Sequence, residues 1–571
     1  MSTLDARTLP VGAHLSADVV VIGTGPSGMT VARELADTGR DILLLEGGSL
    51  DVDAELQDTL KGDAHSQRAE PLEKARQKGL GGASHQWGGR TAPFSPLDFE
   101  ARPGLGIPEP WSFSRQDLEP YYRRAAQALD LRRYEWDAAT ALPGDPEHLL
   151  GRGQDIVEDT GLWRFSPPVR FGDVYRRELD HRANLRLLHH ANVVRLVAEE
   201  RADAGDAEVT QVVAASAPGR TFTVTGRIVV VAAGGLESAR LLLHSEVGTA
   251  HDQVGRNYMI HPIAEVGELQ LSDPHSADTA TRYVKSHDGV WVRRLLTLTE
   301  RVRREQDLLH MGYAIWYEDP MDPSHGDPLL SAYVLARKAL IQLDGFKSAG
   351  MHRRFAAAGG TAQHVRNVAL GAPQLAAFAY TWARDRWADP RTLPAFTRRS
   401  KQGRYRIRFD AEQSPSPENR VTLSRDERDA FGVPRLHVAH RVGDTDRENY
   451  HRSLTLLAEG FARSGFGTYT PPSLDHLLSL ELTDATHQMG LVRTGTRPET
   501  SVVDPDLRVW GTRNLYISST GVFPTASHAG PTMTAVAVAT RLADHLRRRL
   551  VAGTGAVIDH TRPRREEGPA S

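Results

Sequence analysis

The sequence predicts an α/β protein that opens with a parallel βαβ unit and carries a second domain, of α+β character and built on an antiparallel sheet, inserted between segments of the first. Three stretches support this prediction. "ADVVVIGTGPSGMTVARELADTGRDILLLEGG", from residue 17, joins two apolar runs through a glycine turn and a helical segment. "RIVVVAAGGLESARLLLHS", from residue 227, returns to α/β character. Residues 263–480 differ, with short strand-like pieces and a helical, arginine-rich stretch from about 330 to 400.

Composition limits the class of protein. A chain of 571 residues with 40% hydrophobic and 25% charged residues is typical of a globular protein with two large domains. Its net charge of -3 argues against nucleic acid or anionic lipid as a partner. The absence of cysteine excludes disulfides, thiolate metal sites, iron–sulfur clusters and a cysteinyl link to a cofactor, and no metal site is predicted. The first 23 residues lack an export-signal pattern and no apolar run reaches 18 residues, so we expect a cytoplasmic protein without membrane contact.

The first βαβ unit has the pattern of a Rossmann-like dinucleotide site. Its strand over 18–22, helix from about 26 to 38 and strand over 41–45 place a glycine turn between strand and helix. The free amides at the start of such a helix bind phosphates. The motif does not separate NAD from FAD, and glycine turns also join strands and helices for purely steric reasons.

Each glycine of this turn has an expected role. Gly23 allows the tight turn, Gly25 lets the backbone approach a pyrophosphate, and Gly28 lets helix and strand pack closely. Glu46 ends the second strand, where its carboxylate can accept hydrogen bonds from an adenosine ribose.

Further stretches together resemble the glucose-methanol-choline (GMC) family of FAD-dependent oxidoreductases, in its sugar-oxidising, pyranose 2-oxidase-like branch. The resemblance implies FAD rather than NAD, and an FAD-binding fold of the GMC and p-hydroxybenzoate hydroxylase-like type. It rests on the order and spacing of the glycine unit, "GGASHQWGG" at 81–89, "VVVAAGGLESARLLL" at 229–243, "VGRNYMIHP" at 254–262, "PENRVTL" at 417–423 and the last 80 residues.

The resemblance also implies the domain boundaries. Residues 1–110, 186–262 and 481–550 are assigned to a discontinuous FAD-binding domain. Residues 111–185 and 263–480 are assigned to the substrate-binding domain, and residues 551–571 to a flexible tail.

Two histidines near the C-terminus are the predicted catalytic residues. In this family a histidine takes the hydroxyl proton while the flavin takes hydride, and His487 stands in the matching "HQMG" motif. The family's next polar residue usually precedes a Pro-Thr pair, where this chain has Gly530. His528 is the nearest side chain that could replace it, so the two histidines could share the substrate hydroxyl. The alternative is that His528 caps the turn or faces solvent.

The glycine-dense loop and the last helix are expected to line the flavin. Relatives with a covalent flavin have a histidine directly before the loop tryptophan, where this chain has Gln86, so we expect FAD to be held without a covalent bond; a shift of one residue would make His85 the candidate. Pro531 suits the first helical position, and the positive helix end would stabilise a reduced flavin. The expected cofactor-binding residues are Gly23, Gly25, Pro26, Ser27, Gly28, Glu46, Gly47, Gly82, Ala83, Ser84, Trp87, Gly88, Gly89, Val193, Val194, Ala233, Gly234, Thr520, Gly521, Pro531, Thr532 and Met533.

The predicted reaction is oxidation of a secondary alcohol, on a sugar or glycoside, by FAD with oxygen or an external acceptor. Gln86, Trp316 and Tyr317 are the expected substrate-binding residues, although an aromatic strand such as "GYAIWY" is often core. A flavin-containing lyase, a dehydrogenase of a non-sugar alcohol and a flavin protein without catalysis are the alternatives. The oligomeric state is not predicted.

Overall fold

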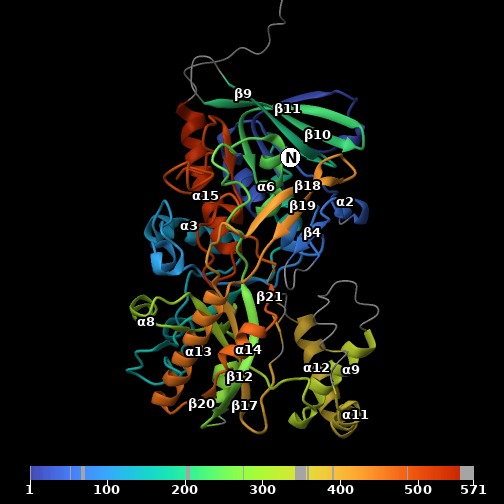
Figure 1. The fold of residues 1–571 in the computed structure, drawn as a ribbon. Helices are drawn as coiled ribbons and strands as arrows, with labels where there is room; N and C mark the ends of the chain where they lie inside the picture. Colours follow the sequence, from blue (N-terminus) through green and yellow to red (C-terminus); the bar gives the residue numbers. More distant parts are fainter. Residues whose placement is uncertain are drawn as a thin grey trace, which may run out of the picture.

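The computed structural model describes residues 2–51, 53–65, 71–200, 206–273, 275–340, 355, 359–388, 391, 393–395, 397–484 and 486–552. Within them the chain forms two large sheets and two small ones. The first large sheet lies in the upper half of Figure 1 and the second in the lower half. Most of the predicted tail, residues 553–571, lies outside the described residues. No described helix is both long and apolar enough to cross a bilayer.

The first sheet contains the predicted parallel unit, extended on one side by an antiparallel pair. Strand β11 lies parallel to β2 and β22, while β10 and β9 continue the sheet in antiparallel fashion. Residues 19–22 and 42–45 are buried throughout, as expected of parallel strands covered on both faces. The strand order is β1 (Ser2–Asp5), β8 (Leu185–His189), β3 (Ile42–Leu45), β2 (His14–Ile22), β11 (Arg220–Val231), β10 (Ala207–Ala217) and β9 (Asn192–Glu200), with β22 (Leu515–Ile517) against β11.

Helices of the first sheet's domain begin and end at recognisable signals. Helix α1 starts at Pro26 and ends at Leu35, three residues earlier than predicted, because residues 36–38 tighten into a 3₁₀ turn closed by Gly39 at a φ of 68°. Helix α15 packs against both α1 and α3, and α6 packs against β9 and against β18 (Arg420–Arg428). The bounds are α1 (Pro26–Leu35), α2 (Ala54–Asp58), α3 (Arg115–Ala128), α5 (Phe171–Leu179), α6 (Gly234–Ser245) and α15 (Thr532–Ala552).

The second large sheet is antiparallel throughout, which confirms the expected antiparallel sheet. Its buried face carries Ile407, Phe409 and Tyr313, and the long helix α13 packs on it through Tyr450 and Phe461. The strands, in order, are β20 (Gly467–Thr470), β12 (Pro262–Leu271), β17 (Arg404–Ala411), β16 (Met311–Trp316), β15 (Leu296–Leu298) and β6 (Val157–Glu158), with β21 (Thr483–Asp484) against β12. The helices beside it are α8 (Glu300–Glu305), α13 (Asp444–Ser464) and α14 (Leu474–Ser479).

Two small sheets and a helical group complete the described chain. The helical, arginine-rich stretch expected from about 330 to 400 contains α9, α11 and α12, which lie together at the lower right of Figure 1. Helix α3, in a segment assigned to the substrate-binding domain, packs against α15 instead. The remaining bounds are β4 (Gly62–His65), β5 (Arg90–Thr91), β7 (Leu162–Phe165), β13 (Val284–Lys285), β14 (Trp291–Arg294), β18 (Arg420–Arg428), β19 (Pro434–Ala439), α4 (Ala138–Ala141), α7 (Ser276–Thr281), α9 (Pro328–Leu340), α11 (Thr361–Leu370) and α12 (Ala372–Ala388).

Candidate active site

A cavity of about 300 Å³ opens at the carboxyl ends of β2, β3 and β11. This is the edge of a parallel sheet at which α/β proteins bind nucleotides. Fifteen of the expected cofactor-binding residues line it: Gly23, Gly25, Pro26, Ser27, Glu46, Gly47, Gly82, Ala83, Val193, Val194, Ala233, Gly234, Thr520, Pro531 and Thr532.

The glycine turn leaves one backbone position open to the cavity. A Cβ on Gly25 would meet nothing within 4 Å, so a ligand can approach the backbone there. Gly23 and Gly28 face the protein instead: a Cβ on Gly28 would lie 2.0 Å from the Gly23 carbonyl oxygen, and Gly23 has a φ of 101°. Backbone contacts thus exclude a side chain at Gly23 and Gly28, whereas at Gly25 the space is left for a ligand.

Glu46 lines the cavity, and backbone and side-chain donors hold its carboxylate. Oε1 accepts hydrogen bonds from the amides of Gly48 (2.7 Å) and Gly79 (3.2 Å), and Oε2 accepts from the amide and hydroxyl of Thr24. Four donors of the chain thus share the two oxygens that were expected to bind a ribose.

Asn192 is a cavity residue that the sequence did not reveal. It begins β9, is only 4% exposed, and neither its Nδ2 nor its Oδ1 has a hydrogen-bond partner among the described residues. A buried amide without partners is costly, so both atoms suit a polar ligand in the cavity. Other polar lining residues outside the prediction are Thr24, Arg76, Gln77, Lys78, Glu237, Arg240, Asp429, Thr486, Gln488 and Ser519.

His487 also lines the cavity and is held by a second histidine, His261. Their Nδ1 atoms lie 2.8 Å apart, and His261 Nε2 lies 2.9 Å from the carbonyl oxygen of Ala526. Strand pairing brings them together, because Met259 and Met489 form an antiparallel bridge and each histidine lies two residues from its side of that bridge. Burial, followed by the neighbouring His261, holds the pKa of His487 well below its ordinary value, so its imidazole is neutral at pH 7.

His528 lies apart from the cavity lining, in a tightly packed polar cluster. It is 3% exposed, and its ring packs edge-on against His310, with 4.2 Å between ring centroids. A Cβ on Gly312 of β16 would lie 2.3 Å from His528 Nδ1, which has no hydrogen-bond partner among the described residues. Burial, followed by His310, holds the pKa of His528 well below its ordinary value. Solvent exposure, one alternative considered from the sequence, is therefore wrong.

The glycine-dense loop lies only partly at the cavity. His85 Nε2 is 2.6 Å from the Leu80 carbonyl oxygen, and Trp87 Nε1 donates to the carbonyl oxygen of Val169 (3.1 Å). Helix α15 begins at Thr532, so the expectation of Pro531 in the first helical position is wrong by one residue; its carbonyl accepts the first helical hydrogen bond, from Ala535. The expected cofactor residues that do not line the cavity are Gly28, Ser84, Trp87, Gly88, Gly89, Gly521 and Met533.

The expected substrate-binding residues do not line the cavity either. Gln86 Nε2 donates to Gln77 Oε1 (3.0 Å). The guanidinium groups of Arg293 and Arg408 lie 4.6 and 5.1 Å from the Trp316 ring centroid, and Tyr317 packs beside that ring at 5.2 Å. Trp316 also packs against the hydrophobic core that contains β2, β3 and β11. This fits the alternative in which the aromatic strand belongs to the core.

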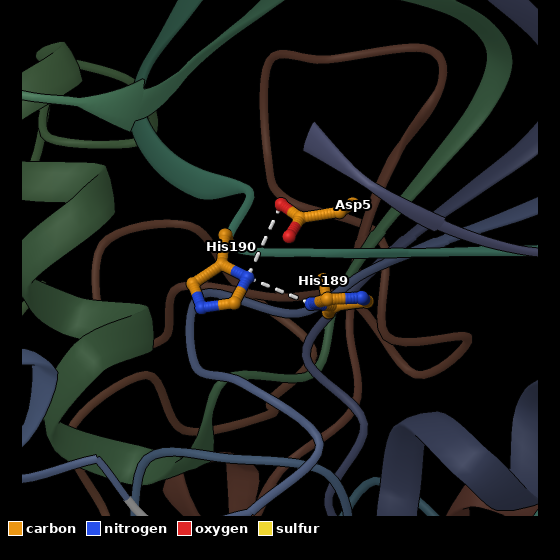
Figure 2. A group of neighbouring side chains, drawn as sticks. All are labelled: Asp5, His189 and His190. Carbon is orange, nitrogen blue, oxygen red and sulfur yellow. Dashed lines mark hydrogen bonds and ion pairs between the residues drawn. The ribbon is translucent and has the colours of Figure 1, made fainter. Parts of the chain in front are cut away.

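A separate cluster of metal-ligand residue types lies at the edge of the first sheet, where Asp5, His189 and His190 converge (Figure 2). Strands β1 and β8 pair in parallel with Asp5 opposite His189. His190 Nδ1 lies 2.7 Å from His189 Nδ1 and 3.3 Å from Asp5 Oδ1. Arg7 binds both oxygens of Asp5, and this side-chain hydrogen bonding lowers the pKa of that carboxyl to about 2. Contacts within the chain thus engage the Nδ1 atoms of both histidines and the carboxylate of Asp5, and we assign the cluster no ion.

Two models of the GMC oxidoreductase family match the chain, one over residues 174–263 and one over residues 415–539. These two segments match the N-terminal and C-terminal parts of GMC oxidoreductases. The matched segments contain His261, His487, His528 and a large part of the cavity lining.

Relatives with known activities match parts of this chain. A C-glycoside 3-oxidase of Microbacterium trichothecenolyticum is 31% identical over 140 residues, which cover 24% of this chain and 26% of that one. A pyranose 2-oxidase of Emericella nidulans is 30% identical over 154 residues, 25% of each chain. The chain thus matches about a quarter of the length of these relatives. A fungal aryl-alcohol oxidase structure shares the fold, with a TM-score of 0.52 at 17% identity over 94% of this chain and 99% of that one.

Proposed function

We propose that this protein oxidises a secondary alcohol of a sugar or glycoside to a ketone, with His487 accepting the hydroxyl proton. The proposal depends on the half-buried imidazole of His487, which lines the cavity at the carboxyl ends of the parallel strands. His261 holds this imidazole through its Nδ1. Anchoring one ring nitrogen leaves Nε2 for a substrate. A histidine with a lowered pKa is neutral at working pH, as a general base must be.

The cavity residues fit FAD, the cofactor of this family. The open backbone at Gly25 suits a pyrophosphate, and the unpartnered amide of Asn192 suits the polar groups of the adenosine half. When bound, FAD supplies the hydride-accepting chemistry of the reaction. The start of α15 at Thr532 presents its positive end to the cavity, where it would stabilise negative charge. We propose non-covalent binding, which the contact of His85 Nε2 with the Leu80 carbonyl oxygen supports.

The substrate class rests on the relatives. The C-glycoside 3-oxidase and the pyranose 2-oxidase support a sugar or glycoside as the electron donor, and oxygen or another external acceptor would take the electrons. Because His528 does not line the cavity, the proton-accepting role is assigned to His487, and a second role for His528 at the substrate hydroxyl stays a prediction.

The test is anaerobic mixing of the yellow protein with sugars, glycosides and simple alcohols while the flavin absorbance is followed. Bleaching by a sugar or glycoside supports the proposal, and bleaching by simple alcohols alone would refute the substrate class. Turnover without any change in flavin colour would favour a lyase instead.

His487→Ala should keep FAD and lower the rate of flavin reduction by about a hundredfold or more, the usual effect of losing a general base. His251→Ala is the matched control, because that histidine is exposed and outside the cavity lining. A normal rate in His487→Ala would show that another group takes the proton.

A further inference from the structure

We infer that His261 is a positioning residue that fixes which ring nitrogen of His487 carries a proton. The inference rests on the proposed function, in which His487 accepts the substrate proton. His261 is fully buried directly before β12 and is not among the cavity residues, so it acts on the reaction only through His487.

The proton positions follow from the hydrogen-bond partners. The carbonyl oxygen of Ala526 can only accept, so the 2.9 Å contact requires a proton on His261 Nε2. A neutral imidazole carries one proton, and His261 Nδ1 is therefore a bare acceptor. The 2.8 Å contact between the two Nδ1 atoms then requires the proton to be on His487 Nδ1. His487 Nε2 is left with its lone pair, which is the state a base needs.

The surroundings of His261 keep its imidazole neutral. Burial is the largest effect on the pKa of His261 and lowers it, and the hydrogen bond to Ala526 opposes it. Among charged groups, Asp410 of β17 raises the pKa of His261 and Arg90 of β5 lowers it, so the two influences oppose one another. The two side chains also form an ion pair with each other, at 2.6 and 3.0 Å. Glu412 contributes a smaller effect that raises the pKa.

The opposite proton arrangement is unfavourable in this packing. A His261 ring with its proton on Nδ1 would direct the lone pair of Nε2 at the Ala526 carbonyl oxygen, leaving two acceptors 2.9 Å apart. His487 would then be protonated on Nε2 and unable to accept from a substrate. When the preferred arrangement takes up the substrate proton on Nε2, the Nδ1–H of His487 still donates to His261, and the hydrogen bond becomes charge-assisted.

The test combines flavin reduction with direct observation of the tautomer. Protein with ¹⁵N-labelled histidine rings is studied by NMR in the FAD-bound form without substrate, and the His487 signals are identified by their loss in His487→Gln. We expect the Nδ1–H form in the wild type and a population of the Nε2–H form in His261→Ala. Reduction by substrate should slow at least about tenfold in His261→Ala with unchanged FAD content, because loss of tautomer control can cost up to about 10⁴ in rate.

His261→Asn keeps an acceptor near the position of Nδ1, and it should restore the Nδ1–H form and most of the rate. His364→Ala, which truncates an equally buried histidine on α11, controls for the loss of buried volume and should leave both readouts unchanged. An Nε2–H form in the wild type, or an unchanged tautomer and rate in His261→Ala, would overturn the inference. A normal reduction rate in His487→Gln would instead refute His487 as the base. The NMR result would then still report whether His261 sets the tautomer of His487.

Discussion

Replacing Gly312 with alanine adds one methyl group against the His528 ring and so tests how tightly that ring is packed. The added Cβ would lie 2.3 Å from His528 Nδ1, 2.9 Å from Cε1 and 3.1 Å from Cγ, more than 1 Å inside ordinary van der Waals contact at the closest atom. The ring cannot simply retreat, because His310 packs against it and is itself held 2.9 Å from Asp98. Overpacking of this kind costs about 1–3 kcal/mol, so we expect the melting temperature to fall by a few degrees.

A double-mutant cycle isolates the contact between Gly312 and His528. In a His528→Ala background the added methyl has room, so Gly312→Ala should cost little, and the coupling between the two substitutions should be about 1–3 kcal/mol. Gly312 has no left-handed backbone, so only the contact is tested, and Gly359→Ala, where a Cβ meets nothing within 4 Å, is the control. A Gly312→Ala protein as stable as the wild type would refute the packing argument.

The same variants test whether His528 takes part in the reaction. If its imidazole contacts the substrate hydroxyl, His528→Ala should slow flavin reduction by about a hundredfold, and Gly312→Ala should slow it less. If His528 only fills space, both variants lose stability and keep the wild-type rate. An unchanged rate in His528→Ala would refute the predicted pairing of the two histidines.

Two further predictions concern the cofactor and the second domain. Asn192→Leu should weaken FAD binding about 3–10-fold, since one or two hydrogen bonds are lost. The measurement is titration of the flavin-free variant with FAD, and a Kd equal to that of the wild type would show that Asn192 does not face the cofactor. Burial raises the pKa of Asp446 from 3.8 to about 6, so its folded-state pKa exceeds the unfolded value; that contribution to stability is fully present below pH 4 and is lost as pH rises through 6. The Asp446→Asn variant should therefore have the melting temperature of the wild type at pH 4 and a higher one at pH 8, with a gain in stability of up to about 3 kcal/mol. If variant and wild type also melted at the same temperature at pH 8, the shifted pKa would be contradicted.

The fold could be predicted where its signals are local. The apolar runs of β2 and β3 and the glycine turn between β2 and α1 lie within 32 residues, so periodicity and turn chemistry suffice to place them. The helix end was missed by three residues because the 3₁₀ turn over 36–38 has no distinct composition. For the second domain the sequence predicted an antiparallel sheet but not its strand order, because that order depends on pairings between strands far apart in the sequence.

The site was less predictable because its key contacts are distant in sequence. His261 stands in a stretch used for the family resemblance, but its partner lies 226 positions away and is set by pairing across residues 259 and 489. Arg76, Gln77 and Lys78 end a stretch rich in charged and turn-forming residues, and nothing in that composition indicates that they face a cavity. Asn192 gave only the weak signal of an amide at the start of an apolar strand.

These contacts also divide the site between the two large sheets. The glycine turn and Glu46 depend on β2 and β3 of the first sheet, whereas His261 and His487 are brought together by the bridge between residues 259 and 489, beside the pairing of β12 with β21 in the second. The expected cofactor contacts and the proposed base therefore rest on separate pairings, although both line one cavity. Loss of the pairing beside His487 would move the proposed base while the glycine turn kept its shape, and a misplacement of about 1 Å can cost about a hundredfold in rate. The geometry of the site thus depends on elements of both sheets, and a motif search in either half cannot measure it.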